Sequence, residues 1–143
     1  SPRAISEVDR SGELPRNKRV LILEDDDLVL SVIDRMVRVL GSKPTSVEAG
    51  EKAVDKARQA MEEGFPFDLF ITDAAIRGTM SGLDALRQIH TFQPELPTIL
   101  TSAYAASQEQ ISESRPEYIA LLPKPFTVTD LRLLLISLFA RQV

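Results

Sequence analysis

Short apolar runs alternate with helix-forming segments along most of this chain, and that alternation limits the fold more than any other feature. The apolar runs have the length of buried strands and cover residues 19–24, 43–47, 68–72, 97–101 and 118–122. The segments with helical spacing of apolar residues cover residues 28–40, 50–62, a stretch that begins near Ser81, and residues 105–113 and 128–140. These pairs predict one α/β domain with a parallel sheet and helices on both of its faces.

A proline indicates the order of the strands. Pro44 lies in the second predicted strand, and proline is tolerated at the edge of a sheet but not in a central strand. An edge position for this strand suits the order 2-1-3-4-5, so the predicted fold is a flavodoxin-like (βα)5 doubly wound parallel sheet. Residues 1–18 have no apolar periodicity and contain two prolines, so we interpret them as a linker or tail before a domain of residues 19–143.

Polar side chains follow four of the predicted strands at the point where each strand ends. They are Glu24 and Asp25, then Asp73, then Ser102, and finally Lys124. In an open parallel sheet, binding sites lie just beyond the carboxyl ends of the strands. The sequence therefore predicts that three carboxylates, a hydroxyl and an ammonium meet at one edge of the sheet, where they can hold a divalent cation and a phosphoryl group.

Composition excludes several other kinds of site. The chain has no cysteine, so a disulfide framework and a thiolate metal site are impossible. Its single histidine, His90, lies in a helical pattern and is interpreted as partly buried packing. Residues 20–143 carry 12 basic and 18 acidic side chains, which argues against direct binding of nucleic acid.

No apolar stretch approaches the roughly 20 residues that span a bilayer, and there is no signal peptide, so we expect a cytoplasmic chain without membrane contact.

Sequence signals also mark the ends of the helices. Asp27 is the predicted N-cap of the first helix, and Gly41 is predicted to end it. Two further pairs have the spacing of a capping box, namely Ser81 with Asp84 and Thr127 with Asp130.

The last predicted helix has apolar residues on two sides. Its expected core stripe contains Leu131, Leu134, Leu135, Leu138 and Phe139. The other side contains Leu133, Ile136 and Ala140. Two interpretations stay open: a contact surface for a second copy of the chain or a neighbouring domain, or the scattered exposed apolar residues that most proteins have.

Five segments together are similar to a known family. The segments resemble, in order and spacing, the motifs of response-regulator receiver domains. They are RVLILEDDD, FDLFITDAAI, GTMSGL, PTILTSA and LLPKPF. The resemblance covers about residues 19–141. It implies a phosphoacceptor domain whose partner is a histidine kinase or a histidine phosphotransfer domain. It also implies a domain that catalyses its own phosphorylation and dephosphorylation, although this chain contains no kinase core.

The resemblance implies a role for each polar residue at the sheet edge. Asp73 would accept a phosphoryl group from phosphohistidine. Asp25 would bind Mg²⁺ (or Mn²⁺) directly, with Glu24 acting through water and the backbone carbonyl of Ala75 as a further ligand. Ser102 would donate a hydrogen bond to the bound phosphoryl group. Lys124 would form an ion pair with that group, and Pro125 would follow it through a cis peptide bond.

The chain departs from the family pattern at two positions. Arg77 stands where many receivers have proline, four residues after Asp73. Leu121 stands at the position of the aromatic switch, three residues before Lys124, so an inward-swinging aromatic ring is not expected here. The segments RGTMSGLDAL and LLPKPF resemble receivers attached to sensor histidine kinases, which favours the C-terminal part of a hybrid kinase.

The sequence is also compatible with parts of three other interpretations. The chain is alternatively a stand-alone single-domain response regulator. A pseudo-receiver, an interaction module without phosphorylation, is a second alternative. A third is a metal-dependent phosphohydrolase with an aspartyl nucleophile, but such enzymes carry a second acid two residues after the nucleophile. Ala75 occupies that position and argues against it.

Overall fold

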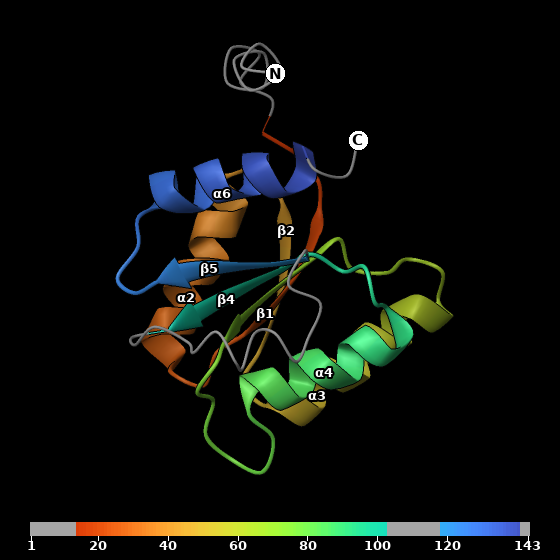
Figure 1. The fold of residues 1–143 in the computed structure, drawn as a ribbon. Helices are drawn as coiled ribbons and strands as arrows, with labels where there is room; N and C mark the ends of the chain where they lie inside the picture. The colour runs from red at the N-terminus through yellow and green to blue at the C-terminus, as the bar shows by residue number, and fades with distance from the viewer. Residues whose placement is uncertain (1–13, 103–117, 141–143) are drawn as a thin grey trace.

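The computed structural model describes residues 14–102 and 118–140, and their core is a five-stranded parallel sheet (Figure 1). The strand order β2-β1-β3-β4-β5 confirms the predicted flavodoxin-like topology. The strands are β1 (Arg19–Leu23), β2 (Lys43–Val47), β3 (Leu69–Asp73), β4 (Thr98–Ser102) and β5 (Ile119–Pro123). Three of them begin and end one residue later than the sequence predicted, a shift within the ordinary uncertainty of strand ends.

Helices cover both faces of the sheet, as Figure 1 shows. They are α2 (Asp27–Val39), α3 (Gly50–Glu62), α4 (Gly82–Phe92) and α6 (Val128–Ala140). One apolar cluster joins the sheet to α2 and α6, and a second joins its other face to α3 and α4. The predicted helix at residues 105–113 lies outside the described residues. Within the described ranges, no helix is long and apolar enough to cross a bilayer.

The central strands are buried on both faces, which explains their continuous apolar runs. In β1, Leu21 packs towards α3 and α4, whereas Ile22 packs towards α2 and α6. Side chains of neighbouring residues in a strand point to opposite faces, so a strand between two helical layers is apolar at most of its positions. Both leucine and isoleucine here are fully buried. The sheet is therefore a rigid base for the residues that follow its strands.

The start of the first helix corrects one prediction. Asp26, and not Asp27, is the N-cap of α2, because its carboxylate accepts hydrogen bonds from the backbone N–H groups of Leu28 (3.0 Å) and Val29 (3.2 Å). Asp26 has extended backbone angles, which a cap requires, while Asp27 is already helical. The two predicted capping pairs are confirmed by reciprocal hydrogen bonds, Ser81 with Asp84 and Thr127 with Asp130.

Helix α6 corrects a second prediction. Ile136 is buried together with Leu131, Leu135 and Leu138, so it belongs to the core and not to a separate apolar face. The cluster that α6 joins includes residues of the sheet, of α2 and of the segment before β1. A helix with several neighbours needs a wider apolar stripe than a helix with one. Of the predicted second face, Leu133 and Ala140 remain exposed.

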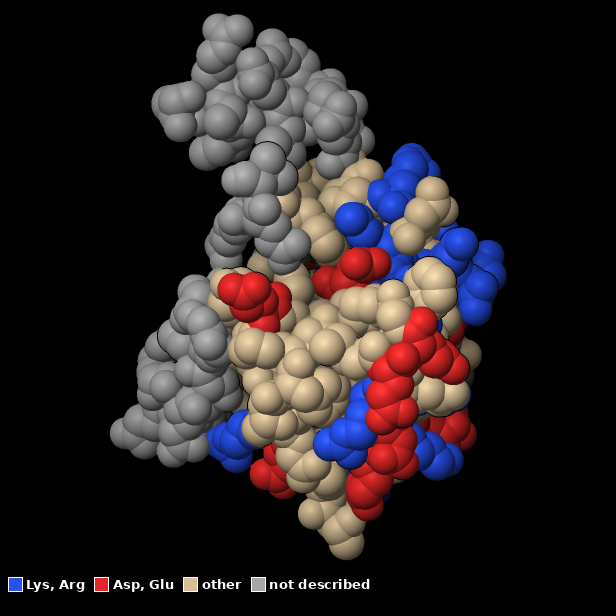
Figure 2. Space-filling model, turned by 90° about the vertical axis from the view of Figure 1, so that its right-hand side faces the viewer, with Lys and Arg blue, Asp and Glu red and all other residues tan. Residues whose placement is uncertain are grey.

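Figure 2 shows the molecule from the right-hand side of Figure 1, away from the ends to which the arrows of β4 and β5 point. Basic side chains gather at the upper right of this view and acidic ones at the lower right, with uncharged residues beside them. Charge of both signs is the pattern of an ordinary solvated surface. The residues that the sequence singled out lie at the opposite end of the sheet.

Candidate functional site

The strand register brings the four polar strand ends to one edge of the sheet. Leu23 pairs with Thr72, Asp73 pairs with Thr101, and Ser102 pairs with Pro123. Because all strands are parallel, the residues that follow them emerge side by side. Segments separated by about a hundred residues in the sequence therefore meet at this edge.

Lys124 joins two of the carboxylates. Its Nζ atom lies 2.7 Å from Oε1 of Glu24 and 2.6 Å from Oδ2 of Asp73, and it donates a hydrogen bond to each. The lysine backbone is fixed as well, since its N–H donates to the carbonyl oxygen of Ser102 at 2.9 Å. The following peptide bond, to Pro125, is cis. The ammonium group is thus held between the ends of β1 and β3.

Burial and charge shift the pKa values of this cluster. Glu24 is only 2% exposed, and burial raises the pKa of its carboxyl group although Lys124 and the N–H of Asp26 act against this. Burial by itself would lower the pKa of Lys124, but its hydrogen bonds and charge interactions with Asp73 and Glu24 outweigh burial and raise it. Lys124 is therefore a cation at neutral pH, and both carboxylates depend on it for charge compensation.

The loop after β3 connects Asp73 to Asp25. The backbone N–H of Ala75 donates to Oδ1 of Asp73 at 2.8 Å, and the N–H of Arg77 donates to Oδ2 of Asp25 at 3.2 Å. The two aspartates are partly buried, so they remain accessible from solvent. The backbone of this one loop therefore donates a hydrogen bond to each of the two aspartates, from Ala75 to Asp73 and from Arg77 to Asp25.

Near its C-terminal end, the same loop is also hydrogen-bonded to α3. The hydroxyl of Thr79 donates to Glu51 of α3 at 2.7 Å, which lowers the pKa of that carboxyl group. Gly82 begins α4 directly against the end of β3, and a Cβ atom there would lie 2.6 Å from Oγ1 of Thr72. Only glycine fits this contact without a shift of the helix or the strand. Sequence reasoning gave these residues no role, because the contacts join segments with unrelated patterns.

Ser102 lies at the same edge as this cluster, whereas Leu121 lies within β5. Ser102 is the last residue of β4 and is partly buried at the same edge as Asp73. Leu121 lies in the outermost strand, β5, and is 40% exposed. The structure thus joins Glu24, Asp73 and Lys124 by direct contacts, while it places Ser102 on the shared edge.

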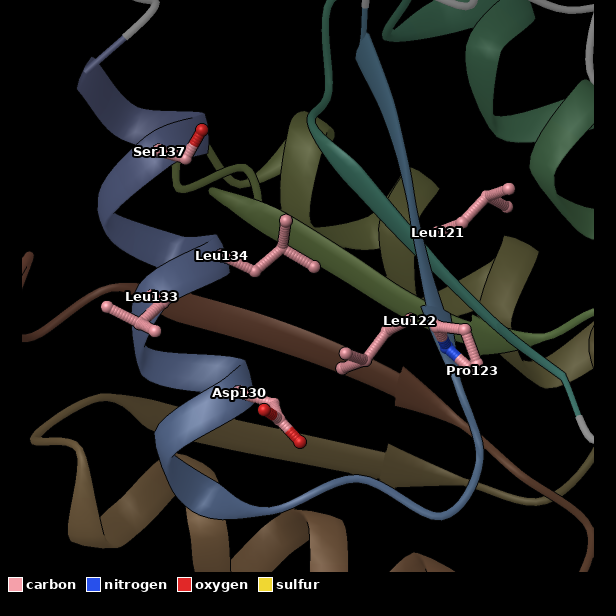
Figure 3. A pocket seen from close by; sticks show the side chains of 7 residues that line it. All are labelled: Leu121, Leu122, Pro123, Asp130, Leu133, Leu134 and Ser137. Atoms are coloured by element: carbon pink, nitrogen blue, oxygen red, sulfur yellow. The ribbon is translucent and has the colours of Figure 1, made fainter.

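A groove runs between β5 and α6, next to the site (Figure 3). Its volume is 510 Å³. It is lined by Leu121, Leu122, Pro123, Asp130, Leu133, Leu134 and Ser137. In Figure 3, Leu134 points from the helix and Leu122 from the strand into the space between these elements. The groove is mostly apolar, and Pro123 links it to Lys124.

The donor set can hold a divalent cation of the hard, oxygen-binding kind. No three Asp, Glu, His or Cys side chains within residues 14–102 and 118–140 are grouped so as to hold a metal ion by themselves. Mg²⁺ does not require such a group, because it is commonly bound by one or two carboxylates and keeps several waters. Glu24 and Asp73 also share the single ammonium group of Lys124. Asp25, Asp73 and the carbonyl of Ala75 therefore fit Mg²⁺ in chemistry and charge.

A doubly wound α/β domain with an acidic cluster and a lysine at its strand ends is the architecture of a receiver module. The family model of the response regulator receiver domain matches residues 20–136, so the chain belongs to that family. The family confirms the resemblance that the five sequence motifs indicated.

The chain is similar to several characterised regulators. It is 25% identical to the response regulator receiver protein CpdR of Brucella abortus, over 80% of this chain and 90% of that protein. It is also 25% identical to the transcriptional regulatory protein ZraR of Klebsiella oxytoca, over 81% of this chain and 25% of that protein. The chain spans half or less of the first relatives that it matches, so it corresponds to one part of them.

Solved structures show the same fold. The receiver domain of the sensor histidine kinase PA1611 from Pseudomonas aeruginosa is 26% identical, with a TM-score of 0.68 over 83% of this chain and 94% of that one. That structure has a magnesium ion coordinated in its active site cleft. The receiver domain of the histidine kinase CKI1 from Arabidopsis thaliana, complexed with Mg²⁺ and BeF₃⁻, has a TM-score of 0.70 at 24% identity, over 91% of this chain and 96% of that one.

Proposed function

We propose that this chain accepts a phosphoryl group from phosphohistidine onto Asp73, as the receiver of a two-component phosphorelay in the cytoplasm. The observation that carries the proposal is the contact of Lys124 with Asp73 at 2.6 Å, at the end of a central strand. The donor would be a histidine kinase or a histidine phosphotransfer domain. Membership of the receiver family supports this class of partner.

In the proposed reaction, a carboxylate oxygen of Asp73 forms a bond to phosphorus. The P–N bond of the donor breaks at the same centre, and its electron pair returns to the imidazole nitrogen. A carboxylate and an anionic phosphoryl group repel each other, so the reaction needs positive charge close to both. Lys124 supplies one such charge from its fixed position. Ser102, at the end of β4, would donate a hydrogen bond to a non-bridging phosphoryl oxygen.

We propose Asp25, Asp73 and the carbonyl of Ala75 as the residues that hold Mg²⁺. When bound, the ion would neutralise the carboxylates and polarise the phosphoryl oxygens. Glu24 is buried against Lys124, so its role would be indirect: it positions the ammonium group and reaches the metal at most through water. The magnesium in the PA1611 receiver supports this choice of ion.

The test is the intact mass of the protein after incubation with Mg²⁺ and acetyl phosphate. The wild type should gain one phosphoryl group, and Asp73→Asn should gain none. Asp55→Asn, which changes an exposed aspartate of α3, is the matched control and should be phosphorylated like the wild type. Addition of a metal chelator should prevent the gain. Equal gains in Asp73→Asn and the wild type would disprove the assignment of Asp73.

If acetyl phosphate does not phosphorylate the wild type, a second phosphoryl donor is tested. If a phosphorylated histidine phosphotransfer domain also leaves the mass unchanged, the chain is a pseudo-receiver, an interaction module without phosphorylation. The cluster of Glu24, Asp73 and Lys124 favours the active form, because two carboxylates that share one ammonium repel each other, a cost that phosphoryl transfer would explain and a purely structural role would not.

For the context of the domain, we propose the C-terminal part of a hybrid sensor histidine kinase. The similarity to receivers of two histidine kinases supports it. The alternative is a stand-alone regulator, and the match over 90% of CpdR favours that form. Sequencing of the gene around this segment would distinguish the two.

We also propose that α6 forms a contact with a second copy or a neighbouring domain. Leu133 is half exposed beside the apolar groove between α6 and β5. Leu133→Glu should leave phosphorylation intact and weaken self-association. An unchanged sedimentation profile of this variant would contradict a homodimer through α6.

A further inference from the structure

The segment before β1 packs against the domain. Leu14 is only 8% exposed, and it belongs to the apolar cluster between the sheet, α2 and α6. A leucine of an unattached linker would be solvated, and burial of its side chain is worth about 2 kcal/mol. Residues 14–18, which we call the strap, are therefore part of the folded unit even though they precede its first strand.

Backbone hydrogen bonds tie the strap to the turn between α2 and β2. The N–H of Asn17 donates to the carbonyl oxygen of Gly41 at 2.8 Å. The N–H of Lys18 donates to Oγ of Ser42 at 3.2 Å, and its carbonyl accepts from the N–H of Lys43 at 2.8 Å. These bonds attach the strap to a turn that has a positive φ of 88° at Gly41 and a hydrogen bond of its own, from the N–H of Ser42 to the carbonyl oxygen of Val37 at 3.1 Å.

Two side chains extend the attachment. Arg16 lies over Gly41, where a Cβ atom would come within 3.3 Å of its Cγ, so the absence of a side chain makes room for the strap. The ammonium of Lys18 lies 5.2 Å from the centre of the Phe139 ring, near the end of α6. A cation over an aromatic face at this distance is attractive. The strap thus contacts both the α2–β2 turn and the last helix.

We propose that the strap is a device that couples α6 to the chain upstream of Leu14. While Leu14 is in the core and Lys18 lies on Phe139, α6 is held against α2. Tension on the preceding segment, or its rearrangement, would detach the strap and remove these contacts. Local opening of α6 would then become easier. The strap does not contact Glu24, Asp73 or Lys124 through any of the interactions described above, so the coupling does not depend on the proposed phosphorylation.

The experiment compares amide hydrogen exchange in the full chain, in Leu14→Asp and in Leu28→Asp. Both variants add a charge in place of leucine, but Leu28 is exposed on α2, outside the proposed contact surface of α6, and serves as the matched control. In Leu14→Asp, the amides of α6 should exchange about tenfold faster or more, because local opening is easier once the strap is released. The amides of α3, on the other face, should exchange as in the wild type, and the control should leave both helices unchanged.

Two results would overturn the proposal. One is unchanged exchange in α6 of Leu14→Asp. The other is an equal acceleration in α6 and α3, which would mean that the variant weakens the whole fold and not a specific coupling. If Leu14→Asp does not fold, Leu14→Ala keeps the test valid with the same comparison of helices. Acetyl phosphate labelling of the same samples is a separate readout, so failure of phosphorylation is distinguishable from failure of the strap.

Discussion

Replacement of Lys124 by methionine tests the electrostatic argument for the site most directly. The substitution keeps the length of the side chain but removes the charge between Glu24 and Asp73. Loss of one partner of a fully buried ion pair costs about 3–5 kcal/mol. Two features reduce this value here: the lysine side chain is 20% exposed, and an uncompensated carboxyl group can take up a proton.

Protonation sets an upper limit on the cost. The ordinary pKa of glutamate is 4.5, so neutralising Glu24 at pH 7 costs about 3.4 kcal/mol at roughly 1.36 kcal/mol for each pH unit. We therefore expect Lys124→Met to lower the free energy of unfolding by about 2–3 kcal/mol at pH 7. The folded variant would bind protons more tightly than its unfolded chain. The difference in free energy of unfolding between the wild type and the variant should therefore become smaller as the pH falls from 7 towards 5.

The assay is urea unfolding of the variant and the wild type at pH 7 and pH 5. Lys56→Met, at an exposed position on α3, is the control and should change stability little. Addition of Glu24→Gln to Lys124→Met should recover part of the loss, because it removes the buried charge. The reasoning would be refuted by a variant as stable as the wild type at pH 7, or by a deficit that is the same at both pH values.

Three further outcomes follow from the same structure. Gly82→Ala should lower the free energy of unfolding by about 2–3 kcal/mol, because a Cβ atom would overlap Thr72 and the backbone of Asp73. Urea unfolding measures this change, and an unchanged midpoint would mean that α4 shifts without cost. Asp26→Ala should cost about 1 kcal/mol through the lost N-cap, whereas Asp27→Ala should cost less, and the reverse order would contradict the cap assignment. The raised pKa of Lys124 implies a contribution to stability that is complete below the ordinary value of 10.5 and is lost as the pH rises through the folded-state pKa. The difference in free energy of unfolding between wild type and Lys124→Met should therefore become smaller in alkaline solution. A difference that does not change with pH would contradict this role of Lys124.

Sequence patterns predicted the elements well where the pattern is local. The range of α3 follows from regular apolar spacing, and that of β2 from a short run with Pro44 at an edge. The sequence predicts the N-cap of α2 one residue late because Asp25, Asp26 and Asp27 are chemically alike. Only the hydrogen bonds from Leu28 and Val29 distinguish them.

Contacts between distant elements were harder to predict. The sequence pattern places Ile136 on a separate apolar face, because helical spacing gives angles around a helix but not the number of elements that pack against it. Leu14 looked like part of a linker, since a single leucine between polar residues has no periodicity to detect. Its burial depends on a pocket made by segments that are distant in the sequence.

The sequence alone determined the alternation of strands and helices, the strand order and the set of polar residues at the strand ends. These properties depend on local periodicity and on the rule that parallel strands end at one edge. The tertiary structure decided which of those residues touch: Lys124 bridges Glu24, a hundred residues away, and Asp73. It also decided that Gly82 must be glycine and that the strap is attached. The reason is physical, because close packing and charge compensation depend on distances between elements, and no local pattern encodes those distances.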